Sequence, residues 1–134
     1  LALILLLDQF SRHLYRGRAE AFASDRHALA LALAAIDAAL DAELGDAERA
    51  FFAMPLHHAE DVAVQERCVA VFAAQHAICA AAWREMAAEF LTYAREHRDV
   101  VARFGRFPHR NAILGRTSTA EEVAYLASAP RYGQ

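Results

Sequence analysis

Apolar side chains recur every three or four residues along most of the chain, the spacing that places them on one face of an α-helix. In residues 1–17 this face consists of Leu3, Leu7, Phe10 and Leu14. In residues 24–45, which a capping Ser24 opens and Gly45 closes, it consists of Leu29, Leu33, Ile36, Leu40 and Leu44. The pattern predicts one helix in each segment.

Two longer helical regions are predicted after Gly45. Asp46 is placed to cap a short helix, which Pro55 ends or kinks. Residues 59–103 have the apolar spacing of a helix over their whole length. A helical region this long indicates two helices rather than one. The break between them is not marked, because Ala80–Ala82 carries no turn signal.

The C-terminal part combines a helix end, a turn and one more helix. One face of the preceding helix carries Phe90, Ala94, His97, Val101 and Phe104. Gly105 and Pro108 predict an irregular turn, which a short helical turn over Asn111–Leu114 follows. Thr119 and Glu122 have the spacing of a capping box and open a last helix, which ends at Leu126.

Composition supports an all-helical fold. The chain contains 33 alanines against five glycines and three prolines, and no segment shows the alternation of a strand. We therefore expect an all-α fold of antiparallel helical hairpins, arranged as a TPR-like array or a bundle, in a single domain over residues 1–134. The chain begins without Met, and we expect it to be a fragment of a longer protein.

Charge is distributed unevenly along the chain. Residues 95–116 contain six Arg and two acids, a local charge of +4, whereas the whole chain has a formal charge of −3. This favours a local anion site or internal charge pairing over nucleic-acid binding, since the chain has no Lys and its pI is about 6.2.

Cysteine spacing and hydropathy indicate a cytoplasmic protein that does not enter a membrane. On one helix, Cys68 and Cys79 would lie roughly 16 Å apart, too far for a disulfide. Free buried thiols are typical of a reducing compartment. The apolar run Leu1–Leu7 is far shorter than the ~20 residues of a membrane span.

The first cluster of titratable residues is Pro55-Leu-His-His-Ala-Glu-Asp61. His58 and Asp61 are three residues apart, close enough on a helix for an imidazole and a carboxylate to share a proton. Without the H-E-x-x-H pattern we predict no metal and no cofactor. The alternative is structural: Glu60 and Asp61 would favour the dipole of a helix N-terminus.

The second cluster is Arg103-Phe-Gly-Arg-Phe-Pro-His-Arg-Asn111. Its guanidinium groups suit carboxylates or phosphates, and Gly105 allows a close backbone approach to an anion. These arginines could equally neutralise Asp8, Glu60 and Asp61 in an internal network. His97 lies on an apolar helix face and is either a core histidine with a hydrogen-bond partner or part of a pocket.

Several motifs together resemble one bacterial family, the domain of unknown function numbered 924. They are Leu6-Leu-Asp-Gln-Phe10, Tyr15-Arg-Gly17, Pro55–Asp61, Tyr93-Ala-Arg-Glu-His97, Arg103–Asn111 and Leu114-Gly-Arg116. The resemblance implies a TPR-like helical fold, a further N-terminal region before this sequence, and no particular reaction. The family pattern tends to have Glu at His57 and Ser at Ala59, which makes His57 a poor candidate and favours His58, Glu60 and Asp61.

We predict one polar pocket between helices as the functional site. Its candidate ligand-binding residues are Asp8, Gln9, Arg12, His58, Glu60, Asp61, His97, Arg103, Arg106, His109, Arg110 and Asn111. The first hypothesis is a binding module for a small anionic molecule or an acidic peptide. The second is a hydrolase-like enzyme with His58 or His109 as general base. The third is a protein-interaction domain in which the polar residues only organise the fold.

Overall fold

The computed structural model describes residues 1–128, and all regular structure in this part of the chain is helical. The expected all-α class is therefore confirmed. The elements are α1 (Ala2–Ile4), η1 (Leu5–Phe10), α2 (Ser11–Leu14), η2 (Ala19–Phe22), α3 (Asp25–Asp37), α4 (Asp46–His57), α5 (Val62–Ile78), η3 (Ala81–Trp83), α6 (Arg84–Phe104), η4 (Pro108–Arg110) and α7 (Ala120–Leu126).

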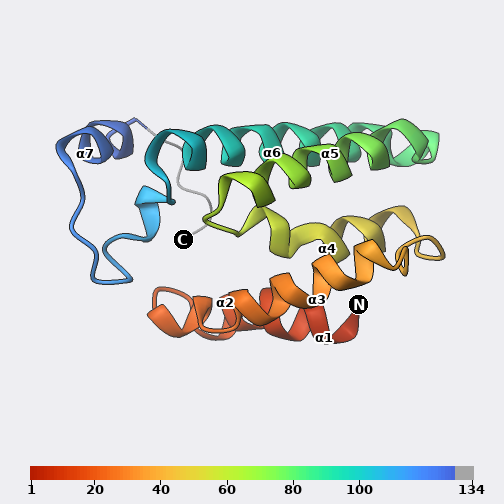
Figure 1. Ribbon diagram of the computed structural model, residues 1–134, viewed down its shortest axis with the longest axis horizontal. Helices are drawn as coiled ribbons and strands as arrows, with labels where there is room; N and C mark the ends of the chain where they lie inside the picture. Colours follow the sequence, from red (N-terminus) through yellow and green to blue (C-terminus); the bar gives the residue numbers. More distant parts are fainter. Residues whose placement is uncertain (129–134) are drawn as a thin grey trace.

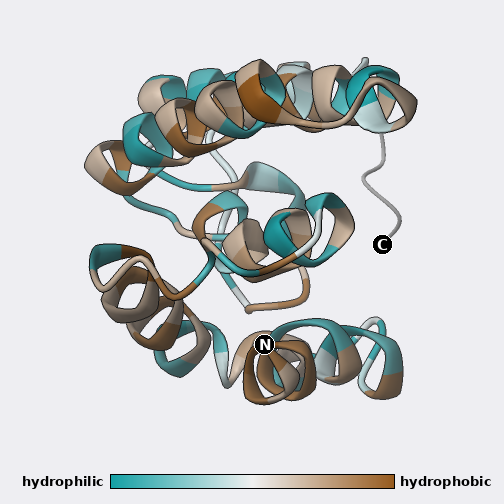
Figure 2. Ribbon diagram, turned by 90° about the vertical axis from the view of Figure 1, so that its right-hand side faces the viewer, coloured by the Kyte–Doolittle hydropathy of each residue, from teal (hydrophilic) through white to brown (hydrophobic). Residues whose placement is uncertain are grey.

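The helices stack in layers. The antiparallel pair of α5 and α6 forms one layer, α4 lies beside it, and α3 with the N-terminal α1–η1–α2 segment forms the opposite layer (Figures 1 and 2). Consecutive helices pack against each other, as short connections favour. The helical hairpins are present, whereas a TPR-like repeat stays a prediction.

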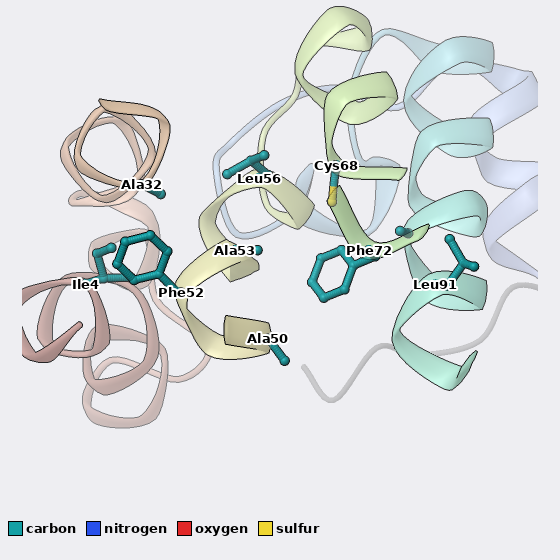
Figure 3. Packing of buried hydrophobic residues seen from close by; sticks show 10 residues of the cluster. Ile4, Ala32, Ala50, Phe52, Ala53, Leu56, Cys68, Phe72 and Leu91 are labelled. Atoms are coloured by element: carbon teal, nitrogen blue, oxygen red, sulfur yellow. The ribbon is translucent and has the colours of Figure 1, made fainter. Parts of the chain in front are cut away.

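One hydrophobic core joins the layers through α4. Phe52 of α4 points toward Ile4 and Ala32 on one side, and Phe72 of α5 fills the space toward α6 on the other (Figure 3). Leu56 of α4 is completely buried between them. Because α4 is buried on both sides, it holds the residues at its C-terminal end in a fixed position.

The predicted inner face of the first helix is wrong. Leu3, Phe10 and Leu14 are more than half exposed, at 54%, 54% and 73%, whereas Asp8 and Ser11 are buried. The reason is the middle element η1, which is a π-helix; its wider hydrogen-bond spacing changes which residues share a face. The inward face therefore carries polar side chains that hydrogen bonds satisfy.

The second helix ends earlier than predicted. It stops at Asp37 instead of reaching Gly45, because Ala39 adopts the left-handed conformation with a φ of 53°. The amides of Ala39 and Leu40 then bond to the carbonyls of Ile36 and Ala35, the pattern of a Schellman motif. Glycine usually occupies this position, and because Ala39 stands there, no residue type marks the end of the helix.

The prediction of two helices within residues 59–103 is confirmed, but the prediction that Asp46 caps a helix is wrong, because Gly45 is the N-cap of α4 and Asp46 is its first helical residue. The break in the long helical region lies at residues 79–83, where the Asp46 carboxylate accepts a hydrogen bond from the Ala80 amide at 3.0 Å. Pro55 lies inside α4, which continues to His57. Both bonds of the capping box between Thr119 and Glu122 are present. In residues 1–128, no helix is long and apolar enough to cross a membrane.

Candidate functional site

A cavity of about 220 Å³ opens at the end of the molecule where α2, α4 and the segment after α6 meet. Its described lining contains three arginines, four histidines and no Asp or Glu. The lining residues are Gln9, Arg12, His13, Arg16, Gly17, Ala21, Phe22, His58, His97, His109, Arg110 and Ile113. Cationic and neutral donors therefore face the cavity, and acidic groups lie only behind it.

The π-helical element η1 delivers Asp8 to the base of this cavity. The Ser11 hydroxyl donates to the carbonyls of Leu7 at 2.7 Å and Asp8 at 3.1 Å, which occupies backbone acceptors of the irregular turn. The Asp8 side chain is completely buried. A buried carboxylate needs partners, and here they are His58, Arg12 and Gln9.

The closest of these partners is His58, which caps the C-terminal end of α4. Its Nδ1 lies 2.6 Å from Oδ1 of Asp8. Burial by itself raises the pKa of Asp8, but the hydrogen bond from His58 and the charge of Arg12 outweigh it, and the pKa is lowered. Burial lowers the pKa of His58 despite the bond to Asp8. At neutral pH the pair therefore consists of a carboxylate and a neutral imidazole.

Arg12 is already committed to groups of the protein. Its Nη2 lies 3.0 Å from Asp25 and 3.5 Å from Asp8, and its Nη1 donates to the Ala21 carbonyl at 3.1 Å. Asp8 and Arg12 thus form an ion pair between residues four positions apart. Arg12 supplies positive charge to one wall of the cavity and holds η2 against α2.

Arg110 is the most deeply buried cation of the site, with 7% of its side chain exposed. Its guanidinium lies between the rings of Phe22 and Phe107, at 4.9 and 4.5 Å from their centres, and Nη1 donates to the His58 carbonyl at 2.9 Å. The nearest carboxylate, Asp25, is 3.7 Å away. Burial and the charge of Arg12 lower the pKa of Arg110 to about 10.

His97 and His109 lie on either side of Phe107. The ring centres of His97 and Phe107 are 5.3 Å apart, and those of Phe107 and His109 are 5.4 Å apart. Burial lowers the pKa of each histidine to about 4. His97 accordingly has both predicted features, because its Nδ1 pairs with the Tyr93 carbonyl at 2.8 Å and its ring lines the cavity.

Glu60 holds the segment after α6 but does not line this cavity. Its carboxylate receives two bonds from Arg116, at 2.7 and 2.9 Å, and one from the Phe107 amide at 2.8 Å. Burial opposes ionisation, but these bonds prevail and the pKa of Glu60 is lowered. The pair fixes Phe107, and through it the positions of His109 and Arg110.

The other predicted residues serve local structure. Arg106 bonds to Glu122 at 2.6 and 2.8 Å, and Asn111 donates to the same carboxylate at 3.2 Å. Arg103 pairs with Glu121 on the surface. The carboxylate of Asp61 accepts from the Val64 amide and caps α5. The arginines of the second cluster therefore pair with Glu121, Glu122 and Asp25, and not with the predicted Asp8, Glu60 and Asp61.

The structure thus divides the twelve candidate residues into two groups. It gathers Asp8, Gln9, Arg12, His58, His97, His109 and Arg110 at the cavity. It assigns Glu60, Asp61, Arg103, Arg106 and Asn111 to caps and ion pairs elsewhere. Sequence reasoning missed His13, Arg16 and Phe22; the Tyr15-Arg-Gly17 motif was the available signal for Arg16.

No group of three or more His, Cys, Asp or Glu side chains in residues 1–128 is arranged to hold a metal ion. Both thiols in this part of the chain are free and buried, as the cysteine spacing predicted. The polar chemistry of the cavity is therefore carried by arginines, histidines and one buried carboxylate.

Comparisons with known proteins place this chain in a family. The model of the family described as "Bacterial protein of unknown function (DUF924)" matches residues 1–130. The chain is similar to the solved structure of the protein of unknown function ATU0120 from Agrobacterium tumefaciens, with 42% identity and a TM-score of 0.81. The alignment covers 96% of this chain and 66% of that one, so the chain spans slightly under two thirds of this relative. No curated protein matches. The chain belongs to the DUF924 family.

Proposed function

We propose that this member of the family is a binding module for a small anionic molecule, held in the cavity between α2, α4 and η4. The observation that carries the proposal is Arg110. It is buried between two aromatic rings, its Nε has no hydrogen-bond partner in residues 1–128, and its closest carboxylate is 3.7 Å away. A phosphate or carboxylate would supply the missing acceptor.

The charge balance at the cavity supports the same ligand. Arg12 and Arg110 both pair with Asp25, and Asp8 pairs with both Arg12 and His58. Each carboxylate behind the cavity wall therefore has more than one donor. Arg16 adds a third cation to the lining. Burial and the charge of Arg12 lower the pKa of Arg110 despite Asp25 and Glu60, and an anion in the cavity would add negative charge beside it.

The paired state of the other arginines supports the expectation that nucleic acid is not the ligand. Arg98, Arg103, Arg106 and Arg116 are paired with carboxylates. This leaves no continuous basic surface from the +4 segment to neutralise a phosphate backbone. We also propose a cytoplasmic location, which the two buried free thiols support.

Calorimetric titration with inorganic phosphate, pyrophosphate and succinate tests the binding proposal. Matched variants are Arg16→Gln, in the cavity lining, and Arg18→Gln, two residues away and exposed. We expect at least one anion to bind, and Arg16→Gln to weaken it about tenfold, the effect of one charge-assisted hydrogen bond. Equal weakening by both variants, or no binding of any anion, would contradict the proposal.

A further inference from the structure

We propose that the Asp8–His58 pair is a general base, and that the anion bound in the cavity is the phosphoryl group of a small phosphate monoester that the protein hydrolyses. This inference rests on the proposed function, because it assigns a reaction to the same cavity. It starts from the contact between Asp8 and His58, which joins two distant segments, η1 and the end of α4.

The pair fixes which nitrogen of His58 carries the proton. A carboxylate only accepts hydrogen bonds, so at 2.6 Å from Asp8 the Nδ1 of His58 must be the donor. The Nε of Arg12 lies 3.4 Å from the same nitrogen. It does not donate to Nδ1, because a protonated Nδ1 has no lone pair to accept the bond. In the neutral ring the lone pair is on Nε2, the atom that can remove a proton.

The Nε2 atom is the ring nitrogen left for the cavity. His58 lines the cavity, and its hydrogen bonds within residues 1–128 involve Nδ1 and the backbone carbonyl. Asp8 lies behind the ring with no exposure of its own. His58 is therefore the base in the cavity wall. Asp8 is a positioning residue, because its buried carboxylate orients the His58 ring.

The position of the base relative to the arginines selects the substrate class. Arg110 and His58 line the same cavity, so an anion held by the arginines lies beside the base. The group that the arginines bind must then be the group that reacts. A phosphate monoester meets this condition, because its phosphoryl group carries the negative charge on its oxygens and the reacting centre on its phosphorus.

The reaction balances with water as the only co-reactant. His58 Nε2 takes a proton from water while the water oxygen forms a bond to phosphorus. The bond from phosphorus to the ester oxygen breaks, and its electron pair stays on that oxygen. The imidazolium then returns the proton to the leaving oxygen, which gives an alcohol and inorganic phosphate. Arg110 and Arg16 would stabilise the phosphoryl oxygens throughout.

Release of inorganic phosphate from phenyl phosphate at pH 7 tests the proposal, with phenyl acetate as the comparison substrate. We expect turnover of phenyl phosphate and a loss of at least ~100-fold in kcat in His58→Gln. The Kd of inorganic phosphate should change less than about fivefold in that variant. Asp8→Asn should lower kcat with little change in KM. The control His27→Gln, on the exposed surface of α3, should equal the wild type.

Different failures point to different errors. Phosphate binding without hydrolysis, equal rates in wild type and His58→Gln, or turnover of phenyl acetate alone would overturn the general-base proposal and leave the binding proposal standing. Absence of binding of phosphate, pyrophosphate and succinate alike would overturn both, whereas binding of succinate alone would overturn only the hydrolysis proposal. Free imidazole should restore activity to His58→Ala, which a structural role would not allow. Where neither variant folds, the wild-type pH profile decides: kcat/KM must fall through one ionisation below pH 6.5, and a flat profile refutes the proposal.

Discussion

The folded protein buries neutral histidines. Lowering the pH from 6.5 to 4.5 should therefore reduce its stability. The pKa values of His97 and His109 are each lowered to about 4 by burial, against about 6.5 in an unfolded chain. Between these two values the unfolded chain binds protons that the folded protein does not. The contribution of these two histidines to the free energy of unfolding is therefore complete above about pH 6.5 and decreases as the pH falls toward 4.

The size of the effect follows from the two pKa differences. One pKa unit corresponds to about 1.4 kcal/mol, so the two histidines together could contribute up to about 6 kcal/mol between pH 6.5 and pH 4. Both rings are half-buried, and solvent screening reduces this figure to roughly 3–4 kcal/mol. His57 and His58, whose pKa values are also lowered by burial, act in the same direction.

Urea denaturation at half-unit pH steps measures this dependence. Protonation of carboxylates does not contribute to the change between pH 6.5 and pH 5. The pKa values of Asp8 and Glu60 are lowered, so their protonation reduces stability only near and below pH 4.5. We expect His109→Gln to reduce the slope by about one proton, and Arg103→Ala, outside the cavity, to leave the slope unchanged. Constant stability from pH 6.5 to pH 5 would refute the assignment of buried neutral histidines.

Four further predictions concern stability and reactivity. Ala39→Gly should raise the free energy of unfolding by about 0.5–1 kcal/mol, because glycine adopts a φ of 53° without strain; a decrease in urea unfolding would contradict it. Leu56→Ala should cost about 3 kcal/mol by the same method, since the side chain is fully buried. Cys68 should react with a thiol reagent only on unfolding, because burial raises its pKa and seals it; rapid labelling of the native protein would disprove this. Arg106→Ala should lower the Tm by leaving the Glu122 carboxylate unpaired, while anion binding stays unchanged.

The sequence was sufficient for the helices whose signals are local. Residues three or four positions apart define the capping box of Thr119 and Glu122. The same spacing defines the helix face that includes His97. The end of α3 was missed because Ala39 occupies a position where the recognisable residue is glycine. The inward face of the first helix was missed because a π-helical turn changes the spacing on which the prediction depends.

The candidate site was predictable in its components but not in its pairing. The clusters around His58 and Arg110 are visible as runs of titratable residues, yet the partner of His58 is Asp8, fifty residues away, and not the neighbouring Asp61. Glu60 likewise pairs with Arg116 at a separation of 56 residues. Such pairs depend on how α4 is packed, which a single sequence does not specify.

The central claim is that the cavity beside Arg110 and His58 binds an anion. A crystal structure of the protein soaked in tungstate, an electron-dense analogue of phosphate, tests it most directly. We predict a tungstate within hydrogen-bond distance of Arg110 and next to Nε2 of His58. An empty cavity in crystals whose surface arginines, such as Arg98 and Arg103, carry tungstate would contradict the claim.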